Sequence, residues 1–375
     1  MTAALANRPA PAPTPPPIPR VTVLVPAHNE ADGIETMVAS LLAQTRQPDR
    51  ILVVADNCTD LTVGMVSRMC DASPVLLDVF TTRGNRHRKA GALNQALRYV
   101  LRYALDDDMV LVMDADSALA PTWIATAIAA MPPDSPVKAV SGMCRGDDTP
   151  GALATLQRME YEQIAAHRTR KGGVTRMLSG AGSAFRVRTL REVADARGNR
   201  LPGRHGDVYN ATSLTEDHEL TLAVRTLGYQ VTSPAGCDVR TEVLTKWRQL
   251  AAQRLRWDRG GLADVLSYGL THVTIGQLGY QLERLAGIAV HLAVIVLVTL
   301  ALVDGGHLVF RPWALAIGVL AAFPAVVGVR RMGWRHMLIA AAVAPQFVYY
   351  LYLEGVAVRA YWQTLTRRAT TWAHN

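Results

Sequence analysis

The chain has 375 residues, of which 50% are hydrophobic, and its 39 Lys and Arg exceed its 31 Asp and Glu to give a formal charge of +8. This composition excludes a disordered chain and allows one large core, with an apolar excess in the last third. The basic residues flank apolar segments and form no patch with interleaved aromatic residues, which favours membrane lipids over nucleic acid as partners.

Composition divides the chain into five parts. The first is Pro-rich, contains no apolar signal segment and is predicted to be disordered. A region of alternating strands and helices follows, then an interfacial helix or linker, a membrane region of about three helices and a basic tail. The expected boundaries are 1–19, 20–261, 262–284, 285–358 and 359–375.

Strand and helix patterns alternate through the first half of the second part. The sequence predicts strands at Val21–Val25, Ile51–Val54, Val75–Phe80 and Met109–Met113, and helices at Gly33–Gln44, Leu61–Cys70 and Ala90–Tyr103. Such alternation is typical of βαβ units and a parallel sheet. There is neither a Gly-x-Gly-x-x-Gly turn after the first strand nor a Gly-Lys-Ser/Thr loop, which disfavours a dehydrogenase and a nucleoside triphosphatase.

Acidic residues stand where two of the predicted strands end. Asp56 follows the second strand, and Asp114 and Asp116 follow the strand Met109–Met113. Open α/β sheets bind ligands at this edge, and a pair of carboxylates suits a divalent cation that keeps phosphate oxygens as further ligands. The pattern therefore indicates a nucleotide-diphosphate substrate.

The order of these and later motifs resembles that of the family 2 glycosyltransferases, in particular the membrane-bound synthases that form cellulose, chitin, hyaluronan and poly-N-acetylglucosamine. The motifs are Val23–Glu30, Asp56–Asp60, Lys89–Asn94, Asp114–Asp116, Gly180–Arg186, Thr215–Asp217 and Gln253–Trp257. The resemblance implies an α/β fold with a GT-A type nucleotide-sugar-binding domain and a mostly parallel sheet, followed by C-terminal transmembrane helices.

The resemblance assigns the earlier motifs to the sugar donor. It implies that Asp56 contacts the nucleotide base, where a carboxylate can accept the imide N–H of uracil and select a UDP-sugar. It places Lys89 near the nucleotide, and it places Asp114 and Asp116 on a Mg²⁺ or Mn²⁺ ion that stabilises the leaving diphosphate. Further residues expected to contact the substrate are Pro26, Asn29, Glu30, Gly180 and Gly182.

Thr215, Glu216 and Asp217 open a predicted helix that ends at Gly228. In the resembled enzymes the last of these positions, Asp217, is the general base. An inverting transfer needs one group to remove the proton of the acceptor hydroxyl as the new bond forms, and a carboxylate within hydrogen-bond reach can do so. We therefore expect these three residues to be catalytic, without a covalent intermediate.

Gln253, Arg256 and Trp257 are spaced so that a helix turns all three to one side. Arg256 can form charge-assisted bonds to a diphosphate, and Trp257 offers an apolar plane to an acceptor sugar. In the resembled family this signature separates polymer-forming members from most single-transfer relatives.

Each motif also has a structural interpretation, which the sequence leaves open. Asp116 or Ser117 could cap a helix that opens a few residues later, and the stretch Asp56–Asp60 could build an Asx-turn. The carboxylates of Thr215–Asp217 could have a purely structural role, in which they complement the dipole of the helix that they open. Lys89 could be an exposed loop lysine.

Three apolar segments, Ala286–Val303, Pro312–Val329 and Met337–Leu353, are each just long enough to cross a hydrocarbon core of about 30 Å. The connector between the second and third is basic, so the positive-inside tendency predicts a catalytic domain on the cytoplasmic face of the inner membrane. Three full spans would place the basic tail outside, against the same tendency. Either the tail lies outside despite its charge, or one segment is re-entrant or interfacial, and Gly269–Gly279 could belong to an interfacial helix.

These features lead to the hypothesis of an inverting, metal-dependent membrane glycosyltransferase that extends a β-linked polysaccharide from a UDP-sugar of glucose or N-acetylglucosamine type. Two alternatives stay open: transfer of a single sugar to a lipid or protein acceptor, and an inactive scaffold that binds nucleotide sugars. No apolar segment precedes the catalytic region, and no gating segment is recognisable after the membrane region. Polymer export would then need a homo-oligomer or a partner protein.

Overall fold

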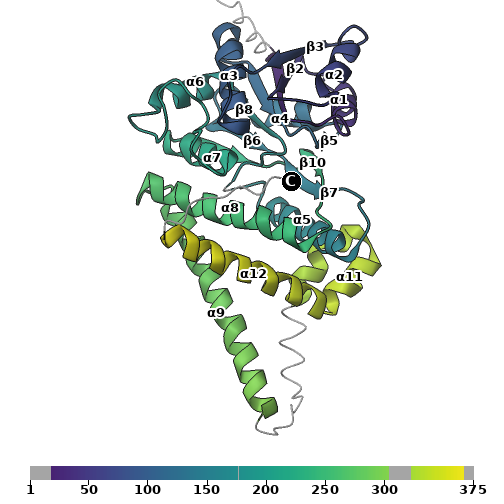
Figure 1. The fold of residues 1–375 in the computed structure, drawn as a ribbon, viewed down its shortest axis with the longest axis vertical. Coiled ribbons are helices and arrows are strands. Elements are labelled where there is room, and N and C mark those ends of the chain that lie inside the picture. The colour runs from purple at the N-terminus through teal and green to yellow at the C-terminus, as the bar shows by residue number, and fades with distance from the viewer. Residues whose placement is uncertain (1–17, 176, 304–321, 367–375) are drawn as a thin grey trace, which may run out of the picture.

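The computed structural model describes residues 18–175, 177–303 and 322–366. A seven-stranded sheet has the strand order β3-β2-β1-β4-β8-β6-β9, and a three-stranded sheet has the order β5-β10-β7 (Figure 1). The strands are β1 Val21–Ala27, β2 Arg50–Ala55, β3 Leu76–Thr81, β4 Met109–Val112, β5 Ala118–Leu119, β6 Val137–Ser141, β7 Met143–Gly146, β8 Ser183–Arg186, β9 Gln230–Thr232 and β10 Asp238–Thr241. The helices are α1 Ile34–Leu42, α2 Thr62–Cys70, α3 Arg88–Tyr103, α4 Trp123–Ala130, α5 Ala152–Arg170, α6 Val187–Ala196, α7 Glu216–Thr226, α8 Trp247–Tyr268, α9 Ile275–Val303, the short 3-10 helix η1 Arg330–Met332, α11 Trp334–Ala341 and α12 Ala344–Leu365.

The large sheet is mostly parallel, as predicted. Strand β1 pairs in parallel with β2 and β4, β2 pairs in parallel with β3, and β6 pairs in parallel with β9. Strand β8 runs antiparallel to both of its neighbours, β4 and β6. All four residues of β4 are buried, which is the pattern of a strand covered by helices on both faces.

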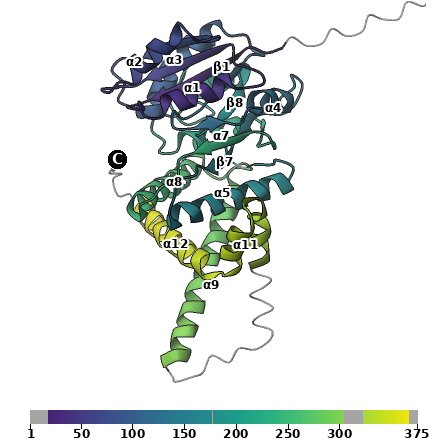
Figure 2. The ribbon, with the colours of Figure 1, turned by 90° about the vertical axis from the view of Figure 1, so that its right-hand side faces the viewer.

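Helices cover both faces of this sheet (Figure 2). On one face, α1, α2 and α4 bury side chains such as Leu41 and Trp123 in one core. On the other face, α3, α6 and α7 bury Leu93, Leu190 and Leu220 in a second core. Fully burying a side chain of this size is worth about 1.5–3 kcal/mol, so the two cores fix the strand ends from which the polar site residues project.

The predicted elements of the first half of the catalytic region agree with the observed ones to within two residues at each end. One of the structural alternatives is wrong. Helix α4 begins at Trp123, after strand β5, so neither Asp116 nor Ser117 caps it. The hydroxyl of Ser117 instead donates a hydrogen bond of 3.0 Å to the Asp116 carboxylate.

The C-terminal third is helical where the structure describes it. Helix α9 is long and apolar enough to cross a membrane over Ile275–Leu297, and a second unit of this kind exists only if α11 and α12, bent by 68°, count as one span. Most of the predicted segment Pro312–Val329 lies outside the described residues, and the predicted segment Met337–Leu353 is divided between α11 and α12. The predicted boundary at residue 261 falls inside α8. A membrane region of three helices therefore stays a prediction.

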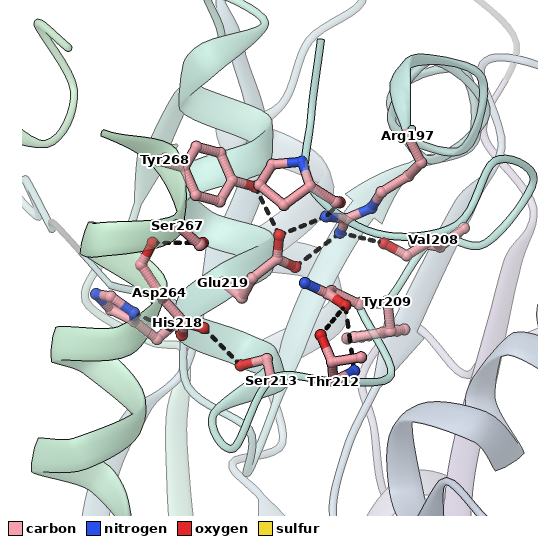
Figure 3. A network of polar contacts seen from close by, with 12 residues as sticks. Arg197, Val208, Tyr209, Thr212, Ser213, His218, Glu219, Asp264, Ser267 and Tyr268 are labelled. Atoms are coloured by element: carbon pink, nitrogen blue, oxygen red, sulfur yellow. Dashed lines mark hydrogen bonds and ion pairs between the residues drawn. The ribbon is translucent and has the colours of Figure 1, made fainter. Parts of the chain in front are cut away.

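A buried ion pair fastens α7 to the end of α6. The side chains of Arg197 and Glu219 have no exposed surface, and the guanidinium binds both carboxylate oxygens (Figure 3). The hydroxyl of Tyr268, at the end of α8, donates a hydrogen bond of 2.6 Å to the same carboxylate. A buried charge is tolerated only when it is paired in this way.

Replacing Glu219 with Ala should lower the free energy of unfolding by about 3–5 kcal/mol, because the variant leaves the Arg197 charge buried without a partner. The measurement is urea unfolding of the detergent-solubilised protein. The control is Asp148→Ala, which removes the partner of Arg240 from a pair that is 88% and 53% exposed and should cost less than about 1 kcal/mol. Equal losses in the two variants would contradict the structural importance of the buried pair.

Candidate active site

A cavity of about 1200 Å³ lies at the carboxyl end of β4 and extends to helices α8, α9 and α12. It brings together ten of the predicted site residues from five separate stretches of chain: Lys89, Asp114, Asp116, Gly180, Thr215, Glu216, Asp217, Gln253, Arg256 and Trp257. The other five predicted residues, Pro26, Asn29, Glu30, Asp56 and Gly182, are not among the residues that line this cavity.

Lys89, in the first turn of α3, links the carboxylates at the centre of the cavity. Its Nζ lies 2.5 Å from Asp114 Oδ1 and 3.1 Å from Glu216 Oε1. Burial alone would lower the pKa of Lys89, but the two carboxylates raise it well above its ordinary value. The ammonium group therefore stays charged and joins the end of β4 to the start of α7.

Asp217 and Glu216 are neighbours in the first turn of α7 with opposite pKa shifts. Asp217 Oδ2 accepts a hydrogen bond of 2.9 Å from the Gly180 backbone N–H. Burial, followed by the charge of Glu216, raises the pKa of Asp217. Burial alone would raise the pKa of Glu216. The positive charge of Lys89 opposes this effect, and the pKa of Glu216 is lowered overall. Asp217 thus has the greater affinity for a proton, as a general base requires.

Asp114 and Asp116 make the end of β4 strongly acidic. Burial raises the pKa of Asp114 despite the attraction of Lys89, and Asp116 adds to the rise. Outside the cavity lining, burial and the charges of Asp116 and Asp114 raise the pKa of Glu30 to about 7. This crowding of negative charge would be relieved by a bound cation.

The donor set fits a Mg²⁺ or Mn²⁺ ion that is shared with a substrate. No three His, Cys, Asp or Glu side chains within the described ranges are placed to hold a metal together. Mg²⁺ is commonly bound by one or two carboxylates and completes its shell with phosphate oxygens and water. Asp114 and Asp116 could supply the two carboxylates.

Asp56 lies at the end of β2, is 7% exposed and has several partners. Its carboxylate accepts hydrogen bonds from Thr82 Oγ1 at 2.7 Å, Asn85 Nδ2 at 2.8 Å and Asn57 Nδ2 at 3.1 Å. These bonds hold the loop that leads into α3. A carboxylate offers about four acceptor positions, so one remains for a further donor.

The remaining predicted residues outside the cavity have local contacts. Pro26 lies within β1. Asn29, in the left-handed conformation with φ 58°, accepts a hydrogen bond of 2.8 Å from the Thr59 backbone N–H. Asp60 accepts the backbone N–H two residues later at 3.0 Å, which agrees with the Asx-turn alternative for this residue. A Cβ on Gly182 would lie 3.1 Å from a side chain of β10, so Gly182 permits close packing of the two sheets.

Asp264, which was not predicted from the sequence, fastens α8 to the start of α7. The Asp264 carboxylate is buried and accepts hydrogen bonds from Ser213 Oγ at 2.8 Å and His218 Nδ1 at 3.1 Å (Figure 3). It also accepts a hydrogen bond of 2.8 Å from Thr215 Oγ1. The Thr215 hydroxyl is therefore engaged with α8. The signal for Asp264 was its spacing of seven residues from Trp257, which places both on one side of α8.

Helix α8 supplies the opposite wall of the cavity. The Arg254 guanidinium lies 4.6 Å from the centre of the Trp257 ring and pairs with Glu160 of α5 at 2.7 Å. This contact fixes the plane of the ring.

Gln253 Oε1 is buried and has no hydrogen-bond partner in the part of the chain that the structure describes. Arg256 lines the cavity, and its positive charge also lowers the pKa of Glu216. Arg254 and Glu160 were not predicted.

Residues 19–260 match the family described as "Glycosyltransferase like family 2". The chain belongs to this family. A probable glycosyltransferase of Bacillus subtilis, YdaM, is 28% identical over 269 residues, which cover 70% of this chain and 60% of that protein. The poly-beta-1,6-N-acetyl-D-glucosamine synthase of Staphylococcus aureus strain MSSA476 is 23% identical over 248 residues, or 64% of this chain and 54% of the synthase. The chain thus spans little more than half the length of these curated relatives.

A solved structure of another protein has a fold similar to that of this family 2 glycosyltransferase. The mannosyltransferase PcManGT from Pyrobaculum calidifontis, in complex with GDP-Man and Mn²⁺, superposes with a TM-score of 0.59 at 22% identity and covers 96% of this chain and 90% of its own. This similarity confirms the predicted α/β GT-A fold with its mostly parallel sheet.

Replacing Gly180 with Ala should lower transferase activity about 100-fold with little change in the unfolding temperature. A Cβ at this position would lie 3.2 Å from Lys89 Nζ and 3.3 Å from Asp217 Oδ2, between the charges of the site, and a displacement of about 1 Å in a catalytic group can cost this much. The measurement is initial rate together with thermal unfolding. Gly64→Ala is the control, since a Cβ there contacts nothing within 4 Å. Equal activity of the two variants would contradict the assigned geometry.

Proposed function

We propose that this glycosyltransferase is inverting and metal-dependent, and that it extends a β-linked polysaccharide with a hexose or N-acetylhexosamine taken from UDP. The proposal rests on one observation. The Asp217 carboxylate, held by the Gly180 N–H, lines the same cavity as Lys89 and the pair Asp114 and Asp116. A base therefore lies beside a group of charges suited to a nucleotide diphosphate.

The donor would bind at the sheet side of the cavity. Lys89 and Arg256 supply positive charge for the diphosphate oxygens. A Mg²⁺ or Mn²⁺ ion held by Asp114 and Asp116 would stabilise the charge that develops on the leaving diphosphate. The remaining acceptor position of Asp56 would take the imide N–H of uracil.

The acceptor would bind at the α8 side. The buried Oε1 of Gln253 lacks a donor among the described residues and would accept a sugar hydroxyl, while Trp257 would pack against the sugar ring. The acceptor hydroxyl oxygen attacks the anomeric carbon as its proton passes to Asp217. The bond to UDP breaks, its electron pair leaves with the diphosphate, and the anomeric configuration inverts.

Two alternative functions would give a different product or no product. Transfer of one sugar to a lipid-linked acceptor is favoured by the reach of the cavity to Tyr280 of α9 and Tyr350 of α12, two helices that each expose several large apolar side chains. A scaffold that only binds nucleotide sugars would show no turnover. In each case we place the protein in the cytoplasmic membrane with its catalytic domain facing the cytoplasm.

Incubation of the nanodisc-reconstituted protein with radiolabelled UDP-glucose, UDP-N-acetylglucosamine or GDP-mannose, with Mg²⁺ or Mn²⁺, tests these proposals. We expect a high-mass product from one UDP-sugar. A single addition to co-purified lipid would support the alternative acceptor, and nucleotide-sugar binding without product would support the scaffold.

In the same assay Asp217→Asn should lower the rate at least about 100-fold with unchanged UDP affinity, because the amide cannot accept the proton. Asp78→Asn, which alters a carboxylate paired with Arg50, is the control and should retain the rate.

Replacing Asp116 with Ala should weaken Mn²⁺ binding in the presence of UDP about 10-fold or more, because one carboxylate ligand is lost. Free Mn²⁺ is measured by electron paramagnetic resonance titration, which does not require turnover. Asp134→Ala, in an exposed loop, is the matched control. Identical Mn²⁺ binding in both variants would exclude Asp116 as a ligand.

A further inference from the structure

Helix α5 forms one wall of the cavity and lies between the small sheet and α12 (Figure 2). Four of its residues that line the cavity are three or four positions apart, which is the spacing of one face of a helix. They are Tyr161, Ile164, Ala165 and Arg168, and we call them the α5 wall. Glu160 of α5 also lines the cavity, but its carboxylate is already paired with Arg254.

Arg168 brings an unpaired positive charge to the α5 wall. Within residues 18–175, 177–303 and 322–366 its guanidinium has neither a hydrogen bond nor an ion pair. By contrast, Arg284 of the same cavity pairs with Asp258 at 2.6 Å. Burial lowers the pKa of Arg168, and the Cys144 thiol is the group that opposes this shift. Because an arginine is not deprotonated in proteins, this partly buried charge needs a partner that a ligand can supply.

The hydroxyl of Tyr161 is a second donor on the α5 wall that has no hydrogen-bond partner among the residues that the structure describes. Burial raises the pKa of Tyr161, so the hydroxyl keeps its proton and can donate it. The nearby polar groups of Cys144 and Ser179 contact each other, with Sγ 3.0 Å from Oγ. The unpaired groups of the α5 wall are therefore a guanidinium, which only donates, and a phenol, which can donate.

Other walls of the cavity present acceptors instead. Gln253 Oε1 of α8 and Glu354 Oε2 of α12 are buried oxygens that lack a hydrogen-bond partner within the described ranges. Such oxygens can accept the hydroxyl protons of a neutral sugar. The donors of the α5 wall suit a different group, because a guanidinium binds a carboxylate or a phosphate through two parallel hydrogen bonds. The walls are thus suited to different parts of one ligand.

Arg168 lies near the proposed base. The Cys144 thiol contacts Ser179, which precedes Gly180, and the Gly180 N–H binds Asp217. Burial raises the pKa of Cys144, and the charges of Arg168 and Asp217 act on it in opposite directions. Both charges are therefore within electrostatic range of one thiol. A group bound at the α5 wall would lie close to the hydroxyl from which Asp217 takes the proton.

We propose that the α5 wall binds an anionic group, a carboxylate or a phosphate, on the sugar acceptor, and that the acceptor of this enzyme is therefore acidic. This inference rests on the proposed function and deepens it by naming the acceptor class. The donor diphosphate would have Lys89, Arg256 and the cation to balance its charge, which leaves Arg168 to the acceptor. A neutral acceptor would cover Arg168 and leave its charge unpaired, which disfavours binding. Since the proposed donor sugars are neutral, another enzyme must supply the acidic unit of the acceptor.

Equilibrium dialysis of the full chain in phosphatidylcholine nanodiscs tests the proposal with three radiolabelled probes. The neutral probe is methyl β-N-acetylglucosaminide, the phosphate probe is N-acetylglucosamine 1-phosphate, and the carboxylate probe is the methyl glycoside of glucuronic acid. Saturating UDP and Mn²⁺ are present throughout, so that the phosphate probe cannot occupy the donor position.

We expect at least one acidic probe to bind about 10-fold or more tightly than the neutral probe, because a charge-assisted hydrogen bond is gained. The tighter of the two acidic probes identifies the anion as a phosphate or a carboxylate. Equal binding of the three probes, or binding of none, would overturn the proposal.

Replacing Arg168 with Gln should weaken binding of the tighter acidic probe about 10-fold or more and leave binding of the neutral probe and of UDP unchanged. Arg168→Lys should restore part of the loss, because lysine keeps the charge but not the paired hydrogen bonds. The matched control is Arg170→Gln. Arg170 stands two positions further along α5, is exposed and is not among the residues that line the cavity, so this variant should keep the wild-type preference.

Two further readouts separate a ligand site from other roles of Arg168. The unfolding temperature of Arg168→Gln should not fall, because the guanidinium has no partner in the described part of the chain, and a clear fall would show a structural role and overturn the proposal. Weaker UDP binding in this variant would assign Arg168 to the donor and would also overturn it. None of these measurements requires turnover, so a failure here is distinguishable from a failure of the proposed reaction.

Discussion

The candidate active site depends on the positive charge of Lys89. Three carboxylates, those of Asp114, Glu216 and Asp217, meet at the wall of one cavity, and without a cation their repulsion would favour neutral forms or a different arrangement. Lys89 bonds to the first two, from the end of β4 and the start of α7. The third, Asp217, accepts the backbone N–H groups of Gly180 and His218, and burial followed by the charge of Glu216 raises its pKa, which suits the proposed role of base. One ammonium group thus sets both the geometry and the division of roles.

The proposed acceptor side is aligned with this centre through buried polar contacts between helices. Asp264 bonds to Thr215 and His218, which stand on either side of Glu216 and Asp217, while Gln253 and Trp257 lie earlier on α8. A movement of α8 relative to α7 would leave the buried Asp264 carboxylate without partners, at a cost of a few kcal/mol. The position of the proposed base relative to the proposed acceptor subsite is therefore held by Asp264 and its hydrogen-bond partners.

The sequence could predict features whose signals are local and could not predict pairings between distant segments. The apolar run of β4 and the carboxylates after it are adjacent in the chain, so the strand and the acidic edge were both predicted. The salt bridge between Lys89 and Asp114 joins residues from two βα units, and a lysine in a basic loop has the same local pattern whether it is paired or exposed. Likewise, nothing near Asp56 indicated that Thr82 and Asn85 would bind it.

Hydropathy does not distinguish the packed face of α12 from its exposed face, because it averages the two faces of a helix. The segment Met337–Leu353 is apolar enough for a span, yet it bends at the junction of α11 and α12, and its inner face bonds to the charged helix α5. The hydrogen bond between Tyr349 and Glu160 joins residues 189 positions apart, so the apolar run alone could not reveal it.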